Sequence, residues 1–288
     1  MVGKVFIVKL EGYSGCELEI IEKDEKKYVR KSSGNPEYNN RLINQKTKQE
    51  ELCLPNYKIC HVYEDGFIND RYFFVMDYIN GKTLADSMEQ LELFEIQEYV
   101  DLLTGHFLTD GNYDPLAKEV FTKKAESLER DIFKKLGNDV PINVQSALSL
   151  IKDFSWSHVI KSDCHGDLTM ENILISRNSF YLIDCLDSFY NSWMIDAAKL
   201  LQDAEFLWTH RKKKRSSNLY VRMTVFRDLL IKKIENMPDG KVLKETVYYI
   251  LLLNVLRIFP YADLKNDGDY LLNATDTLLK TITKENTL

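Results

Sequence analysis

Residues 162–188 read SDCHGDLTMENILISRNSFYLIDCLDS and join a polar loop to two short apolar runs. The runs, 173–175 and 180–183, are separated by residues 176–179 (SRNS), whose composition is typical of a tight turn. This pattern predicts a β-hairpin. The polar loop enters the hairpin at its open end, and Asp184 leaves it at the same end.

Three oxygen-bearing side chains are expected to meet there, because the closed hairpin brings Asn172 beside Asp184 and next to Asp167. Asn172 and Asp184 suit Mg²⁺, which takes a few oxygen ligands and leaves room for phosphate oxygens. Asp167 can accept the proton of an attacking hydroxyl and orient it. The spacing of Asp, four residues and Asn is that of a kinase catalytic loop. A polar loop with Asp184 as a turn cap would explain the composition but not this joint spacing.

The stretch resembles the aminoglycoside phosphotransferase and choline kinase group, the small-molecule branch of the protein-kinase-like fold. His165-Gly166-Asp167 stands where protein kinases have His-Arg-Asp, and Ile183-Asp184 stands for their Asp-Phe-Gly. The resemblance implies an α+β bilobal fold with a small antiparallel β N-lobe and one helix over residues 1–80. A larger, mostly helical C-lobe would cover residues 81–288. It also implies ATP, or GTP, as phosphoryl donor and Mg²⁺ as the metal.

Composition narrows the class of partner and the compartment. Lys and Arg number 38 against 44 Asp and Glu, and the net charge of −6 argues against nucleic acid as a partner. The 5 cysteines are scattered and unpaired in spacing, which indicates reduced thiols of a cytoplasmic protein. The first residues show neither a signal peptide nor a membrane span, and the apolar stretch 242–260 is interrupted by charges and predicts a buried helix.

The N-terminal strands are expected at 4–10, 16–21 and 27–31, with a polar turn holding Ser14 between the first two. The turn amides and the Ser14 hydroxyl would face phosphate oxygens. Lys31 is assigned as the phosphate-binding lysine, since it follows an apolar pair at the spacing of the resembled family. The neighbouring Arg30 would point to the opposite face of the strand.

A helix over Pro36–Leu54 would orient this lysine through a side chain. Here the sequence departs from the family, because the inward-facing candidates Gln45 and Gln49 are neutral. Glu50 is the preferred carboxylate, although a glutamine amide would also position the lysine without the charge-assisted component.

Two further strands are expected near 59–63 and 72–78, joined by the polar Glu64 to Asp70. The second ends at Asp77 and resembles the hinge between kinase lobes. In that comparison backbone groups after Asp77, including those of Ile79, would bond the adenine edge. An ordinary core strand and turn is the alternative.

Helical periodicity marks 91–108, 116–136 and 144–154 as the scaffold of the C-lobe. Asp196 begins another helix, and in the resembled family an Asp at this separation braces the catalytic loop by accepting its backbone amides. Arg257 lies on an apolar helix and needs a partner. An internal ion pair is the first expectation for it, and a place in the acceptor pocket with Tyr261 and Asp263 is the second.

The predicted activity is Mg²⁺-assisted transfer of the γ-phosphoryl group of ATP to a hydroxyl of a small molecule such as a sugar or an amino alcohol. Two alternatives stay open. One is a nucleotide-binding pseudokinase that acts as a scaffold, suggested by the missing lysine–glutamate pair, and the other is an aminoglycoside-modifying phosphotransferase. A protein kinase is disfavoured, because the short interval from Asp184 to Asp196 leaves no room for a peptide-docking segment.

Overall fold

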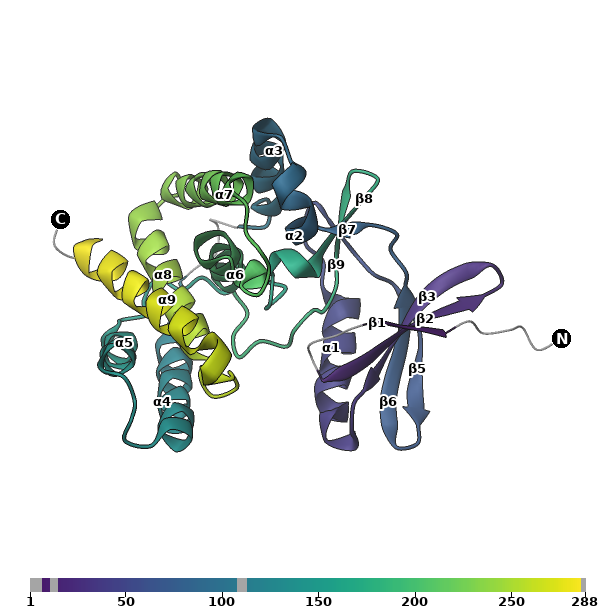
Figure 1. Cartoon of the computed structure of the whole chain (residues 1–288), viewed down its shortest axis with the longest axis horizontal. Coiled ribbons are helices and arrows are strands. Elements are labelled where there is room, and N and C mark those ends of the chain that lie inside the picture. The colour runs from purple at the N-terminus through teal and green to yellow at the C-terminus, as the bar shows by residue number, and fades with distance from the viewer. Residues whose placement is uncertain (1–6, 11–14, 108–112, 286–288) are drawn as a thin grey trace.

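The computed structural model describes residues 7–10, 15–107 and 113–285. Its elements form two lobes (Figure 1). We call the five-stranded sheet with helix α1 the sheet lobe, and the helices α2–α9 with a second, smaller sheet the helical lobe. The apolar side chains form two separate clusters, a small one under the five-stranded sheet and a large one among the helices.

The five-stranded sheet is antiparallel, with the order β1-β2-β3-β6-β5. Its strands are β1 (Ile7–Leu10), β2 (Cys16–Lys23), β3 (Lys26–Ser33), β5 (Val62–Ile68) and β6 (Arg71–Asp77). The expected connector from Glu64 to Asp70 is therefore wrong, because most of it is strand β5. The chain turns at Asn69 and Asp70, both with positive φ, a conformation that these two residue types tolerate.

The second sheet has the order β4-β9-β8-β7 and lies between the five-stranded sheet and most of the helices (Figure 1). Its strands are β4 (Tyr57–Ile59), β7 (Lys82–Thr83), β8 (Ile173–Ser176) and β9 (Ser179–Leu182). β8 and β9 are the predicted hairpin, with Arg177 and Asn178 at φ 47° and 58° in the two-residue loop. Residues near 59 do not continue into the large sheet, since β4 pairs parallel to β9.

The predicted helices are present, although the one expected over 91–108 ends at Leu103 and the one expected to begin at Asp196 begins at Trp193. The helices of the structure are α1 (Asn39–Glu51), α2 (Leu84–Ser87), α3 (Leu93–Leu103), α4 (Ala117–Leu136), α5 (Ile142–Asp153), α6 (Trp193–Phe206), α7 (Ser217–Glu235), α8 (Gly240–Leu256) and α9 (Leu264–Glu285). A short 3₁₀ turn, Pro36–Tyr38, precedes α1, and the Asn35 side chain accepts a hydrogen bond from the Tyr38 N–H. The predicted helix over Pro36–Leu54 therefore starts with a 3₁₀ turn, and α1 itself begins at Asn39 and ends at Glu51, before the predicted end.

Helix α8 is almost wholly buried, as its apolar sequence predicted. Within the described residues, no helix combines the length and apolarity that crossing a membrane requires.

The described cysteines are free, and burial raises the pKa of the Cys164 and Cys185 thiols to about 12, which makes them poor nucleophiles. Residues 211–215 (RKKKR) form a basic run, and three of its side chains form ion pairs. Arg211 and Lys212 pair with Asp267, and Lys213 pairs with Asp86.

Candidate active site

The loop that carries Asp167 is fixed by a buried carboxylate of helix α6. Asp196 is fully buried and accepts hydrogen bonds from the backbone N–H groups of His165 (2.7 Å) and Gly166 (2.8 Å). The predicted bracing role of Asp196 is confirmed. Gly166 has φ 87°, and a Cβ there would lie 2.4 Å from the Leu186 carbonyl oxygen, so only glycine fits between the two strands of chain.

A second buried carboxylate, two turns further along α6, braces the end of the same loop. Asp203 accepts hydrogen bonds from the Met170 N–H (2.7 Å) and from the Thr209 N–H and hydroxyl (3.0 and 2.8 Å). The sequence analysis missed it. Its seven-residue spacing from Asp196 was the available signal, because such positions share one face of a helix.

Replacing Asp196 with alanine is expected to destabilise the protein by about 3 kcal/mol, because two buried backbone donors lose their acceptor. The melting temperature should fall by roughly 5–10 °C. Differential scanning calorimetry measures this change, with the exposed Asp163→Ala as a matched control on the same segment. An unchanged melting temperature for Asp196→Ala would contradict the bracing role.

Asp167 lies beside a lysine of α6 that sequence reasoning also missed. The Lys199 Nζ is 3.0 Å from Asp167 Oδ1, and the Asp167 side chain is one-third exposed. Burial opposes the charged form of Asp167, but the Lys199 ammonium, with a smaller contribution from Arg257, helps to hold the pKa of the carboxyl below its usual range. Asp167 is therefore a carboxylate at neutral pH.

Asn172 and Asp184 come together at the open end of the hairpin, as predicted. The Ile183 N–H donates to the Asn172 carbonyl (3.1 Å), which places Asp184 one residue beyond this pair. The Asn172 amide donates to the Asp167 carbonyl oxygen (2.8 Å), and within the described chain its Oδ1 has no hydrogen-bond partner. Asp184 has φ 61°, so the chain turns sharply there.

His165 ties the Asp167 loop to this hairpin end. Its Nε2 lies 2.8 Å from the Ile183 carbonyl oxygen, and its Nδ1 lies 3.3 Å from the Asp167 N–H. The ring therefore donates through Nε2 and accepts through Nδ1 as a neutral imidazole. Burial lowers the pKa of His165, which favours this neutral form.

Lys31 of β3 reaches across from the sheet lobe to the hairpin end. It is 1 % exposed, forms an ion pair with Asp184 and donates to the Gln45 side-chain oxygen of α1 (3.0 Å). Arg30, the adjacent residue, lies on the opposite face and pairs with Glu19. The structure thus brings Lys31 to the same centre as Asp167, Asn172 and Asp184.

The expectation for Glu50 was wrong. Its carboxylate pairs with Lys46 at 2.8 Å, one turn back on α1, and is largely exposed. The position that faces Lys31 belongs to Gln45, so a neutral amide replaces the expected carboxylate. Ser14 lies outside the described residues.

The chain that joins the lobes holds Asp77 and Ile79. The Asp77 carboxylate accepts hydrogen bonds from the His61 N–H (2.8 Å) and the Tyr63 hydroxyl (2.7 Å), and the Asp77 N–H donates to the His61 carbonyl. The carboxylate and the N–H of Asp77 are therefore already hydrogen-bonded within the protein. Ile79 lines a cavity of about 730 Å³, together with Ile175 and Tyr181 of the hairpin.

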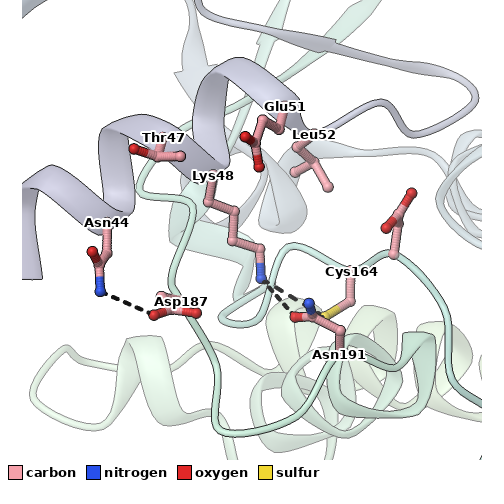
Figure 2. Close-up of a pocket in the computed structure, with 9 residues that line it drawn as sticks. Asn44, Thr47, Lys48, Glu51, Leu52, Cys164, Asp187 and Asn191 are labelled. Atoms are coloured by element: carbon pink, nitrogen blue, oxygen red, sulfur yellow. Dashed lines mark hydrogen bonds between the residues drawn. The ribbon is translucent and has the colours of Figure 1, made fainter.

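Helix α1 also contacts the segment that follows Asp184. Lys48 reaches from α1 toward the helical lobe and donates to the Leu186 carbonyl (2.8 Å) and the Asn191 side chain (3.3 Å), as Figure 2 shows for Asn191. In the same view Asn44 donates to Asp187 (3.2 Å). These bonds link the helix that positions Lys31 with the segment that carries Asp184.

A separate cavity of about 420 Å³ opens directly onto Asp167. Lys199, Arg257 and Tyr261 line it together with Asp167. Arg257 and Tyr261 thus share a cavity with Asp167, whereas Asp263, which was expected beside them, is not among its lining residues. The expected internal ion pair was wrong, because Arg257 has no ion pair among the described residues.

No family model matches the chain, and no curated protein matches it in sequence. Solved structures do match it over nearly its whole length. A thermostable mutant of aminoglycoside phosphotransferase APH(4)-Ia, in its apo form, has a TM-score of 0.67 and 14% identity, with 96% of this chain and 95% of that chain covered. Another mutant of that enzyme, in a ternary complex with AMP-PNP and hygromycin B, has a TM-score of 0.64 and 15% identity, covering 99% and 96%. ADP-bound APH(2'')-Ib has a TM-score of 0.56 and 16% identity, covering 97% and 94%.

The chain has the fold of these aminoglycoside phosphotransferases. At such low identity the likeness establishes the fold alone, and the predicted α+β bilobal class is confirmed. Within this phosphotransferase fold, the activity has to be argued from the side chains that meet at Asp167 and at the hairpin end.

Proposed function

We propose that the protein is a small-molecule kinase that transfers the γ-phosphoryl group of ATP to a hydroxyl, with Mg²⁺. The observation that carries this proposal is the convergence of Lys31, Asp167, Asn172 and Asp184, from both lobes, on one centre. We also propose the lobe boundary near residue 80, with residues 1–80 covering the nucleotide and residues 81–288 holding the acceptor.

Asp167 would orient the acceptor hydroxyl and take up its proton as the reaction proceeds. The bond between the γ-phosphorus and the bridging oxygen breaks, and a bond from that phosphorus to the acceptor oxygen forms. ADP leaves with the bridging oxygen, and Asp167 passes the proton to solvent. Lys31 would bind phosphate oxygens of the nucleotide, which requires it to exchange part of its contact with Asp184.

The hairpin end would supply oxygen ligands of the kind that Mg²⁺ takes. The Oδ1 of Asn172, which has no hydrogen-bond partner among the described residues, and the carboxylate of Asp184 are the two groups that would hold the ion. A bound Mg²⁺ supplies charge neutralisation at the phosphate oxygens. The backbone of Ile79 would bond the adenine edge.

The proposal is tested by measuring ADP release from Mg-ATP, and in parallel from Mg-GTP, across a panel of sugars, amino alcohols, nucleosides and aminoglycosides. Stimulation by one class of acceptor, lost in Asp167→Ala, is expected. Mg-dependent ATP binding without stimulation by any acceptor would favour the scaffold alternative, and the absence of nucleotide binding would contradict both.

Lys199 is expected to set the pH range in which Asp167 is active. Replacing Lys199 with methionine removes the charge that lowers the pKa of Asp167, so this pKa rises and the carboxylate is lost at higher pH. The acidic limb of the kcat profile should therefore move to higher pH, with kcat at neutral pH about tenfold lower because the carboxylate is less well oriented. Lys199→Arg should keep the limb close to its original place. Identical pH profiles for Lys199→Met and the unmodified protein would contradict the assignment.

A further inference from the structure

Two neighbouring cavities beside Asp167 share a set of cationic side chains. The first, of about 420 Å³, contains Asp167 itself, and the second, of about 510 Å³, contains Asp187. Arg41, Lys124 and Arg257 line both. They come from α1, α4 and the end of α8, so three distant parts of the chain deliver positive charge to one place.

These three cations have no carboxylate within ion-pair distance in the part of the chain that the structure describes, although acidic residues line the same cavities. Among the described residues, the Arg257 guanidinium donates one long hydrogen bond, 3.4 Å, to the Asn254 side-chain oxygen. Arg257 and Lys124 both lie against the Phe189 ring, at 5.7 and 5.8 Å from its centroid. Burial, followed by repulsion from Arg257, lowers the pKa of Lys124, so the positive charges oppose one another.

A buried hydrogen-bond donor, the side-chain amide of Asn254, lies in the same cavity as these cations. Asn254 is 1 % exposed and lines the first cavity, and its Nδ2 has no hydrogen-bond partner among the described residues. A buried amide donor without an acceptor is costly, and native structures satisfy such groups almost always. An oxygen of a molecule bound in the cavity would supply the missing acceptor, next to Arg257.

We propose that the phosphoryl acceptor is a small hydroxyl-bearing anion, carrying a carboxylate or a phosphate group. This inference rests on the proposed function. The anionic group would lie between Arg257 and Asn254, with Lys124 nearby, while the reacting hydroxyl lies against Asp167. A cationic acceptor such as an aminoglycoside would meet like charges in this cavity, and a neutral sugar would leave the three cations without a counter-charge.

The test uses four probes with similar carbon skeletons: glucose, glucosamine, gluconate and glucose 6-phosphate. Their binding to the full chain with Mg-ADP is measured by calorimetry, and ADP release from Mg-ATP is measured in parallel. At least one anionic probe is expected to bind at least about tenfold more tightly than glucose, and glucosamine is expected to bind most weakly. The gluconate and glucose 6-phosphate arms distinguish a carboxylate from a phosphate.

Variants of the cavity residues test whether these cations bind the anionic probe. Arg257→Met and, separately, Lys124→Met should weaken binding of the anionic probe by about tenfold to a hundredfold and leave the affinity for Mg-ATP within about threefold. Lys134→Met, which alters an exposed lysine of the same helix α4 outside the cavity, should change neither quantity. Because Lys124 is only partly buried, its variant gives a result even if Arg257→Met fails to fold.

Equal or tighter binding of glucose or glucosamine than of both anionic probes would overturn the inference, and so would the absence of binding by all four. A loss of Mg-ATP affinity in the variants, with unchanged binding of the probe, would also overturn it by assigning the cations to the nucleotide. None of these results decides the proposed kinase activity, which fails if the unmodified protein binds no Mg-ATP or if no acceptor of the wider panel stimulates ADP release.

Discussion

Replacing Asp167 with alanine is expected to lower kcat by about 10²–10⁴-fold, the usual contribution of a positioned general base. The reason is geometric as well as chemical, because Asp167 is the carboxylate that faces the proposed acceptor cavity from the braced loop. The affinity for Mg-ATP should change by less than about threefold, since Lys31, Asn172 and Asp184 remain in place. Steady-state kinetics and calorimetric titration of the nucleotide measure the two quantities separately.

Asp163→Asn provides the matched control, because Asp163 is an exposed carboxylate four residues earlier on the same segment. It should behave as the unmodified protein does. Asp167→Asn keeps the shape of the side chain while removing its basicity, so it should lose kcat to a similar extent as the alanine variant. Full activity of either Asp167 variant would show that the proton acceptor has been assigned to the wrong residue.

Replacing Asp184 with asparagine is expected to weaken the binding of Mg-ATP, whereas the Asp167 variants are expected to lower kcat. The variant removes a charged metal ligand and also leaves the buried Lys31 ammonium with only the neutral Gln45 amide. The Kd for Mg-ATP should rise by at least about 100-fold, because the loss of even an outer-shell partner of a metal ligand costs about 10–100-fold in metal affinity. Titration of Mg-ATP into the variant measures this loss, and ATP in the presence of EDTA measures the metal-free reference.

Two results would separate the roles of Asp184. If the metal account is correct, the affinity of Asp184→Asn for ATP should no longer depend on Mg²⁺, whereas that of the unmodified protein should. If Asp184 served only to position Lys31, both proteins would show the same dependence on Mg²⁺. That second outcome would remove Asp184 from the proposed metal site.

The hairpin and the groups at its open end were predictable, because a two-residue turn converts local spacing into geometry. Once residues 173–176 pair with 179–182, Asn172 and Asp184 have to meet. Lys31 was assigned from its spacing in the resembled family, and strand alternation then puts the adjacent Arg30 on the opposite face. In each case the sequence distance that mattered was short.

The parts that were missed depend on packing between distant elements. Gln45 was already an inward-facing candidate, but whether it or Glu50 meets Lys31 depends on how α1 packs against β3, which the sequence does not state. Strand β4 pairs with β9, more than a hundred residues away in the chain. The cationic cavity is lined by residues from three helices, and no local sequence pattern predicts it.

Helix α6 is an intermediate case. Asp196, Lys199 and Asp203 fall on one face of that helix, and each contacts the loop at 165–170. The sequence contained this pattern, but Asp196 alone was interpreted. A charged triad at helical spacing directly after a catalytic-type hairpin is therefore a useful signal of residues that hold such a loop.

The most direct test of the central claim is the affinity of the unmodified protein for ATP with and without Mg²⁺, measured by isothermal titration calorimetry. The account predicts binding that depends on Mg²⁺, because Asn172 and Asp184 hold the metal and Lys31 holds the phosphates. Absence of ATP and GTP binding in the presence of Mg²⁺ would contradict the account.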